Sequence, residues 1–203
     1  MNDKKHWYDG LIYDKFIAPN QDKLFDEIKK IIEPESTVLD VGCGTGRLAL
    51  KNANHFKSIT GIDLSSKNIK VANTNLAKTN IKNVKFIHGT ATDLKNTIKE
   101  KFDYAVITYV IHEMPPEDRV KVLKEMREVA NKIIIGDYIT PTPNTFWGKL
   151  NVVVEFLAGT DHYNNFKLFV KSGGLISLIK EADFKLLKEI KNKPQTAHLV
   201  VIE

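Results

Sequence analysis

Glycine occupies every second position near the end of the segment Val38–Gly46, which reads VLDVGCGTG. The apolar residues before the glycines predict a strand, and the residues after them predict a helix. Glycine accepts positive φ angles and lets a ligand approach without a Cβ in the way. A helix N-terminus adds unpaired N–H groups. Gly42, Gly44 and Gly46, with the carboxylate of Asp40 before them, therefore predict a binding loop for a small polar ligand.

The glycine spacing bears on two common nucleotide loops. A dinucleotide loop reads G-x-G-x-x-G. Counted from Gly42 its third glycine falls on Arg47, and counted from Gly44 it falls on Ala49, which a looser pattern permits. An NAD site is disfavoured but remains open. A phosphate-binding P-loop is excluded, because no Gly-Lys-Ser/Thr closes the segment.

Two further acids follow the second and third predicted strands. Asp63 stands where a carboxylate can accept hydrogen bonds from ribose hydroxyls. Asp93 follows the third strand, where it could accept an adenine amino group, with Ala91 and Thr92 beside the ring. For each acid the alternative is a helix cap, at Asp63 for a helix that starts near Ser65.

Short apolar runs alternate with helical patterns along the chain. Near-continuous apolar strands suit a parallel sheet covered on both faces, and the alternation implies right-handed crossovers. The predicted strands are 37–41, 58–62, 84–88, 104–110 and 132–139, and the helices between them are 46–54, 65–78 and 115–130.

The end of the chain predicts a helix at 172–182 and two strands at 184–190 and 197–202. The link between these strands is too short for a parallel crossover, so they should form an antiparallel hairpin. The expected fold is α/β, a seven-stranded, mostly parallel sheet with its last strand antiparallel and helices on both faces.

The composition limits the classes of protein to which this chain can belong. The chain has 203 residues, a net charge of +5 and one cysteine, which predicts a single domain over 1–203 without an internal disulfide. The chain has no apolar run of about 18 residues, so no membrane span is predicted. The N-terminus lacks the apolar core of a signal peptide. A cytoplasmic location is expected. Of the 30 basic residues, 27 are lysines spread along the chain, which indicates a solvated surface and no DNA partner, and makes RNA a disfavoured one.

These motifs together resemble the class I S-adenosylmethionine-dependent methyltransferases. The resemblance is carried by the glycine loop at 38–46, GIDLS at 61–65, GTATDL at 89–94 and FDYAVITYVIHEMP at 102–115. It covers about residues 20–139, and the terminal hairpin agrees with that family's reversed last strand. It implies a Rossmann-like fold, S-adenosylmethionine as cofactor, S-adenosylhomocysteine as product, and in-line displacement at the methyl group.

The resemblance also implies roles for individual residues. Asp40, Gly42, Gly44 and Gly46 would hold the amino-acid end of the cofactor, Asp63 and Leu64 the ribose, Ala91, Thr92 and Asp93 the adenine, and Thr108 the sulfonium.

This chain lacks the residues that several kinds of methyl transfer require. Amino methylation of nucleic-acid bases usually has an Asn/Asp-Pro-Pro-aromatic string after the fourth strand, where this chain has TYVI at 108–111. Cytosine C5 and arsenite methylation need cysteines, and the single cysteine, Cys43, lies in the cofactor loop. Metal-dependent catechol methylation needs carboxylates after both the fourth and fifth strands, but only Asp137 is so placed, so no metal is predicted. A small-molecule acceptor with an oxygen, nitrogen or carbon nucleophile remains. The alternatives are an RNA or protein methyltransferase and a non-catalytic cofactor-binding protein.

Two aromatic segments lie outside the alternation. Residues 1–19, which include Tyr8 and Tyr13, resemble the N-terminal lid of ubiquinone/menaquinone-type methyltransferases and could close over the cofactor. The insert at 140–171 follows the fifth strand, and its aromatic residues suit the wall of a site for a small, partly apolar substrate. For Phe156, Phe166 and Phe169 we favour the alternative, in which they form a small core beneath the insert.

Three residues are candidates for catalysis. His112 follows the fourth strand, and its ordinary pKa near 6.5 suits a general base. Tyr138 ends the fifth strand on the same edge, and His162 lies in the polar cluster DHYNN of the insert. The alternatives are a structural histidine at a helix start for His112 and an ordinary loop for His162.

Overall fold

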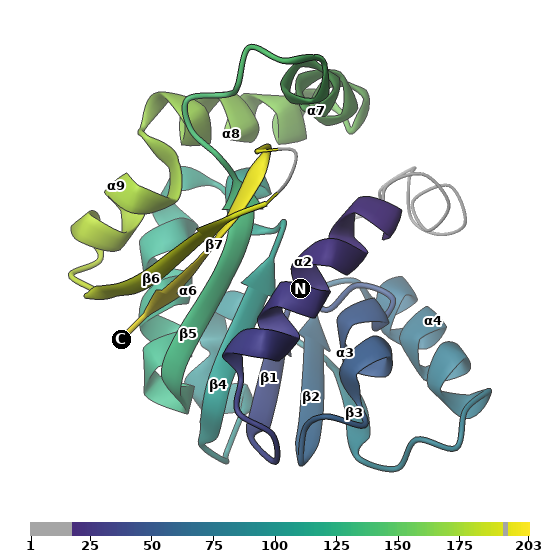
Figure 1. The fold of residues 1–203 in the computed structure, drawn as a ribbon. Helices are drawn as coiled ribbons and strands as arrows, with labels where there is room; N and C mark the ends of the chain where they lie inside the picture. The colour runs from purple at the N-terminus through teal and green to yellow at the C-terminus, as the bar shows by residue number, and fades with distance from the viewer. Residues whose placement is uncertain (1–17, 193–194) are drawn as a thin grey trace.

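The computed structural model describes residues 18–192 and 195–203, and its centre is a seven-stranded sheet in the order β3-β2-β1-β4-β5-β7-β6 (Figure 1). The strands are β1 (Thr37–Val41), β2 (Ser58–Asp63), β3 (Val84–His88), β4 (Phe102–Thr108), β5 (Ala130–Tyr138), β6 (Leu186–Lys191) and β7 (Ala197–Ile202). The first five strands pair in parallel, whereas β7 is antiparallel to both β5 and β6. This confirms the expected sheet and its reversed last strand.

Helices cover both faces of the sheet. They are α2 (Ala18–Ile31), α3 (Arg47–Asn52), α4 (Ser66–Ala77), α5 (Leu94–Thr97), α6 (Pro116–Val129), α7 (Phe146–Leu157), α8 (Thr160–Lys171) and α9 (Gly174–Glu181), with short 3₁₀ turns η1 (Ala91–Asp93) and η2 (Ile111–Glu113). Among the described residues, no helix is both long and apolar enough to cross a membrane.

Alternation along the strands builds two cores. In β1, Leu39 and Val41 face one core, which includes residues of α6 and α9, while Val38 faces the other, which includes residues of α2, α3 and α4. Successive strand side chains point to opposite faces, and burying each large apolar side chain contributes about 1.5–3 kcal/mol. The two cores fix the carboxyl ends of the parallel strands at one edge of the sheet.

Some element boundaries differ from the sequence-based expectations. β4 ends at Thr108 because Tyr109 has a φ of 55°, which a continuing strand cannot accommodate. The predicted lid at 1–19 overlaps α2, which begins at Ala18. The remainder of the lid, with Tyr8 and Tyr13, lies outside the described residues.

The insert at 140–171 consists mainly of α7 and α8, which lie beyond the carboxyl end of β5 at the top of Figure 1. Phe166 and Phe169 are buried, at 3% and 1% exposure, but Phe169 belongs to the main core that includes residues of α6 and α9, not to a separate small core. The expectation that Phe156 joins such a core is also wrong, because Phe156 is 64% exposed. Adjacent helical positions point about 100° apart, and in α7 it is the neighbouring Glu155 that faces inward.

Candidate functional site

The glycine loop connects β1 to α3 and is tied to the neighbouring strand. The backbone N–H groups of Gly42 and Cys43 both donate to the Ile62 carbonyl, at 2.8 and 3.1 Å. Gly44 has a φ of 52°, and a Cβ built on it meets no described atom within 4 Å. Gly46 has a φ of 82° and immediately precedes α3. The loop thus has a left-handed backbone and open space above Gly44.

Asp63 joins this loop to the start of α4. Its Oδ2 accepts a hydrogen bond from the Gly44 N–H and its Oδ1 accepts one from the Ser65 N–H, both at 2.8 Å. The helix cap is Ser65, whose hydroxyl accepts from the Asn68 N–H, so the capping alternative for Asp63 does not hold. Burial raises the pKa of Asp63, and the two backbone hydrogen bonds oppose that rise.

Asp40 is a buried carboxylate in β1, the strand beside β2 and Asp63. Its Oδ2 has no hydrogen-bond partner among the described residues, and a buried polar atom in that state is costly. Burial, followed by the charge of Asp63, raises the pKa of Asp40 to about 7. A ligand with a cationic or N–H donor group would satisfy this oxygen. S-adenosylmethionine carries an ammonium group and two ribose hydroxyls, so the acids and the open loop fit it.

The other residues predicted to contact the cofactor lie on the same edge. Ala91, Thr92 and Asp93 form η1 after β3, Thr108 ends β4, and all four are half-buried. Asp93 precedes α5 without capping it through its side chain. Leu64, also half-buried, follows Asp63 directly. The structure therefore brings these positions together, while their contacts with a cofactor stay predictions.

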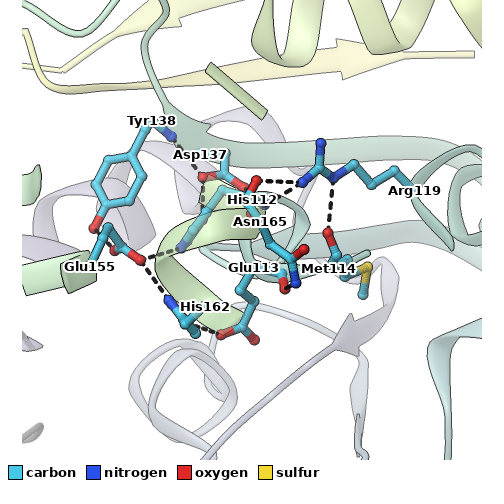
Figure 2. A network of polar contacts seen from close by, with 9 residues as sticks. All are labelled: His112, Glu113, Met114, Arg119, Asp137, Tyr138, Glu155, His162 and Asn165. Carbon is cyan, nitrogen blue, oxygen red and sulfur yellow. Dashed lines mark hydrogen bonds and ion pairs between the residues drawn. The ribbon is translucent and has the colours of Figure 1, made fainter. Parts of the chain in front are cut away.

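A buried polar network lies at the ends of β4 and β5 (Figure 2). His112, in η2, is 2% exposed. Its Nδ1 lies 2.7 Å from Asp137 Oδ1, and its backbone N–H donates to Asp137 Oδ2 at 3.1 Å. Its Nε2 lies 3.4 Å from Glu155 Oε2. Both ring nitrogens of His112 thus face carboxylates.

Glu155, from α7, joins this pair to α8. Its Oε2 lies 2.8 Å from His162 Nδ1, and its Oε1 accepts a hydrogen bond from the Tyr138 hydroxyl at 2.8 Å. His162 Nε2 contacts Glu113 on the opposite side of the ring. Figure 2 shows the two imidazoles pointing toward Glu155 from different elements.

Charge explains the protonation states in this network. Burial alone lowers the pKa of His112, but the carboxylates of Asp137 and Glu155 outweigh it and raise that pKa well above its ordinary value. The pKa of His162 is raised to about 9, because Glu113 and Glu155 outweigh burial in the same way. Burial and Glu155 raise the pKa of Tyr138, so its phenol stays neutral.

Arg119 of α6 attaches α8 to the turn that carries His112. Its guanidinium donates to the carbonyls of Met114, at 3.1 Å, and Asn165, at 2.7 Å. The Asn165 side chain in turn donates to the Glu113 carbonyl at 2.9 Å. These bonds fix α8 and His162 over η2.

The sequence-based site did not include Glu113, Arg119, Glu155 or Asn165. The sequence does contain a pattern that indicates Glu155, because it is the only acidic residue in the apolar helix FWGKLNVVVEFL. If such an acidic side chain is buried, it requires hydrogen-bond or ion-pair partners. Arg119 is one of only three arginines in the chain.

Comparison with known proteins shows which proteins this chain is similar to. Residues 38–132 match the family described as "Methyltransferase domain". A Methanococcus maripaludis protein described as "Probable cobalt-precorrin-6B C(15)-methyltransferase (decarboxylating)" is 33% identical over 111 residues, which cover 53% of this chain and 59% of that protein. A Listeria monocytogenes demethylmenaquinone methyltransferase is 32% identical over 101 residues, covering 48% of this chain and 41% of that protein. The chain thus matches about half the length of these curated relatives.

The fold extends this likeness over nearly the whole chain. The crystal structure of magnesium protoporphyrin IX methyltransferase from Synechocystis PCC 6803, with bound SAH, superposes with a TM-score of 0.65 at 15% identity, covering 99% of this chain and 89% of that one. At this identity the likeness concerns the fold alone. The family match covers residues 38–132, just under half of the chain, and the sheet order and the glycine loop agree with a methyltransferase-like fold.

Proposed function

We propose that this chain transfers the methyl group of S-adenosylmethionine to a small-molecule acceptor with an oxygen, nitrogen or carbon nucleophile. The observation that carries the proposal is the buried Asp40 carboxylate, one oxygen of which has no partner among the described residues, beside the loop that Asp63 fixes. The two curated relatives are named as methyltransferases of cobalt-precorrin-6B and of demethylmenaquinone, which supports a small-molecule acceptor.

Each residue at this edge has a role in the proposal. Asp40 accepts a hydrogen bond from the ammonium of the cofactor's amino-acid end, and Gly44 leaves room for that end to approach. Asp63, beside Leu64, accepts its two backbone bonds and a longer bond of 3.4 Å from the Asn68 side chain to Oδ1, so its Oδ2 keeps a lone pair for a ribose hydroxyl.

The remaining contacts follow the order of the strands. Ala91, Thr92 and Asp93 surround the adenine, and Thr108 lines the reacting end. When bound, S-adenosylmethionine supplies an electrophilic methyl group. The protein therefore acts mainly by aligning the acceptor and excluding water, and such positioning can contribute about 7–11 kcal/mol.

The acceptor would meet the cofactor beneath α7 and α8. Tyr138 presents a neutral phenol at the end of β5, and His162 reaches the same network from α8. A base at His112 stays a prediction. Both of its nitrogens face carboxylates, so accepting a proton from substrate would require one of these pairs to open.

Calorimetry with S-adenosylhomocysteine tests the cofactor site. We expect wild type to bind and Asp63→Asn to bind about 10-fold to 100-fold more weakly, because a carboxylate with charge-assisted hydrogen bonds is worth about 1.5–3 kcal/mol. Asp103→Asn is a matched control. Asp103 also accepts a hydrogen bond from a backbone N–H, that of Thr37, at 2.8 Å. It lies at the start of β4, at the opposite end of the parallel strands from the cofactor loop. Absence of binding at millimolar ligand would reject the proposal.

A labelled-methyl assay on fractionated cell extract tests the acceptor. The expected result is label in a small molecule identified by mass spectrometry. Label confined to RNA or protein would refute the acceptor class, and tight cofactor binding with no labelled product would refute catalysis.

A further inference from the structure

We infer that His112, Glu155 and His162 form a binding site for one divalent transition-metal ion, with zinc as the ion that best matches the donors. Nothing in the glycine loop or the acids at 40 and 63 takes part in it. The inference therefore stands independently of methyl transfer.

Three donor atoms converge from three separate elements. They are His112 Nε2 from η2, Glu155 Oε2 from α7 and His162 Nδ1 from α8, and all lie within 4.8 Å of one another. Bonds of about 2.0–2.2 Å at tetrahedral angles place the donor atoms around zinc about 3.3 Å apart. The 3.4 Å between Glu155 Oε2 and His112 Nε2 matches that value, whereas the 2.8 Å between Glu155 Oε2 and His162 Nδ1 is shorter, so an ion would have to separate this second pair.

Each candidate ligand is oriented by a second group, as metal ligands usually are. The other nitrogen of His112 faces Asp137 at 2.7 Å, and the other nitrogen of His162 faces Glu113. The second oxygen of Glu155 accepts from the Tyr138 hydroxyl. Carboxylate–histidine pairs of this kind fix the tautomer and direct the second ring nitrogen toward the ion.

Burial and donor type narrow the choice of ligand. The side chains of His112 and Glu155 are only 3% and 4% exposed, and Glu155 Oε2 accepts no well-aligned hydrogen bond from the described residues. Two imidazole nitrogens with one carboxylate oxygen suit zinc and neighbouring transition ions, whereas magnesium and calcium require oxygen ligands.

Such a site would fix the insert to the sheet, because its ligands join α7 and α8 to the turn after β4. Three protein ligands also leave one position for water or a substrate oxygen. This site differs from that of metal-dependent catechol methylation, which needs carboxylates after both β4 and β5. Metal binding would also rule out His112 as a general base, because a metal-bound nitrogen cannot accept a proton.

The direct experiment titrates the chelator-treated full chain with zinc and cobalt, with magnesium for comparison. We expect one zinc per chain, a rise in the melting temperature, and cobalt absorption with the intensity typical of four-coordinate sites. Glu155→Gln, which preserves shape, should weaken zinc binding about 100-fold or more and abolish the melting shift. Asp137→Asn should weaken it about 10-fold to 100-fold, and His55→Gln, away from the cluster, should have no effect.

Several outcomes would overturn the inference. These are no stoichiometric zinc binding by wild type, six-coordinate cobalt, or equal affinity in wild type and Glu155→Gln, which would indicate a site elsewhere. If the variant does not fold, X-ray absorption of zinc bound to wild type decides instead. Two imidazoles with one carboxylate support the site, and any other donor set refutes it.

Discussion

Replacing Asp40 by asparagine should make the cofactor-free protein more stable and less able to bind cofactor. Asp40 is 2% exposed, and one of its oxygens has no partner among the described residues. Asparagine keeps the shape of the side chain and removes the buried charge. The change therefore separates the cost of holding this carboxylate in the fold from its benefit to the site.

The size of the effect follows from the pKa. The pKa of Asp40 rises from an ordinary 3.8 to about 7 in the folded chain, which at 1.36 kcal/mol per pH unit corresponds to about 4 kcal/mol. The folded state holds the proton more tightly than the unfolded state, so stability falls as the pH rises from about 4 to about 7 and then levels off. About 3 kcal/mol of this loss lies between pH 5 and pH 8.

Denaturant unfolding at pH 5 and pH 8 measures the effect. We expect Asp40→Asn to exceed wild type by about 2–4 kcal/mol at pH 8, and by clearly less at pH 5, since only the wild type carries the penalty. S-adenosylhomocysteine should stabilise wild type more than the variant, because ligand binding to the folded state adds to stability. Asp103→Asn should act in the opposite direction, because hydrogen bonds from Thr37 lower the pKa of Asp103.

Two results would refute this reasoning. One is a variant no more stable than wild type at pH 8, which would mean that the carboxylate is solvated or paired in the folded chain. The other is a gain in stability that does not change between pH 5 and pH 8, because that gain would not come from ionisation.

Three further predictions concern the glycine loop, the insert at 140–171 and the hydrogen bonds of Arg119. Gly44→Ala should weaken S-adenosylhomocysteine binding measured by calorimetry. Gly159→Ala is the control and should leave that binding unchanged. Both glycines have positive φ and open space around a Cβ, but only Gly44 lies in the glycine loop. Phe166→Ala should cost about 3–5 kcal/mol in denaturant unfolding, whereas Phe156→Ser should cost less than about 0.5 kcal/mol because Phe156 is exposed; equal losses would contradict the assigned burial. Arg119→Lys should lower the free energy of unfolding by about 2–3 kcal/mol, because hydrogen bonds to the carbonyls of Met114 and Asn165 are lost. Protease cleavage within the insert should accelerate, and an unchanged cleavage rate would contradict the role of Arg119 in attaching α8.

The sequence alone determined the strands, their parallel pairing and the edge that carries the cofactor loop. These features depend on local patterns: apolar runs of strand length, glycines where φ is positive, and an acid at the end of a strand. Because parallel strands end at a common edge, the sequence alone predicts that Asp40, Asp63 and Asp93 lie near that edge. The hairpin at the end of the chain followed from the shortness of its link.

Only the tertiary structure decided which side chains the insert buries. Whether Glu155 faces solvent or His112 depends on how α7 and α8 fold back over the sheet, and no local pattern encodes that docking. The same docking leaves Phe156 exposed while it buries Phe169. The position of His112 after β4 predicts it as a site residue, but its carboxylate partners, Asp137 and Glu155, come from separate elements. Their charges, through space, set the protonation of His112.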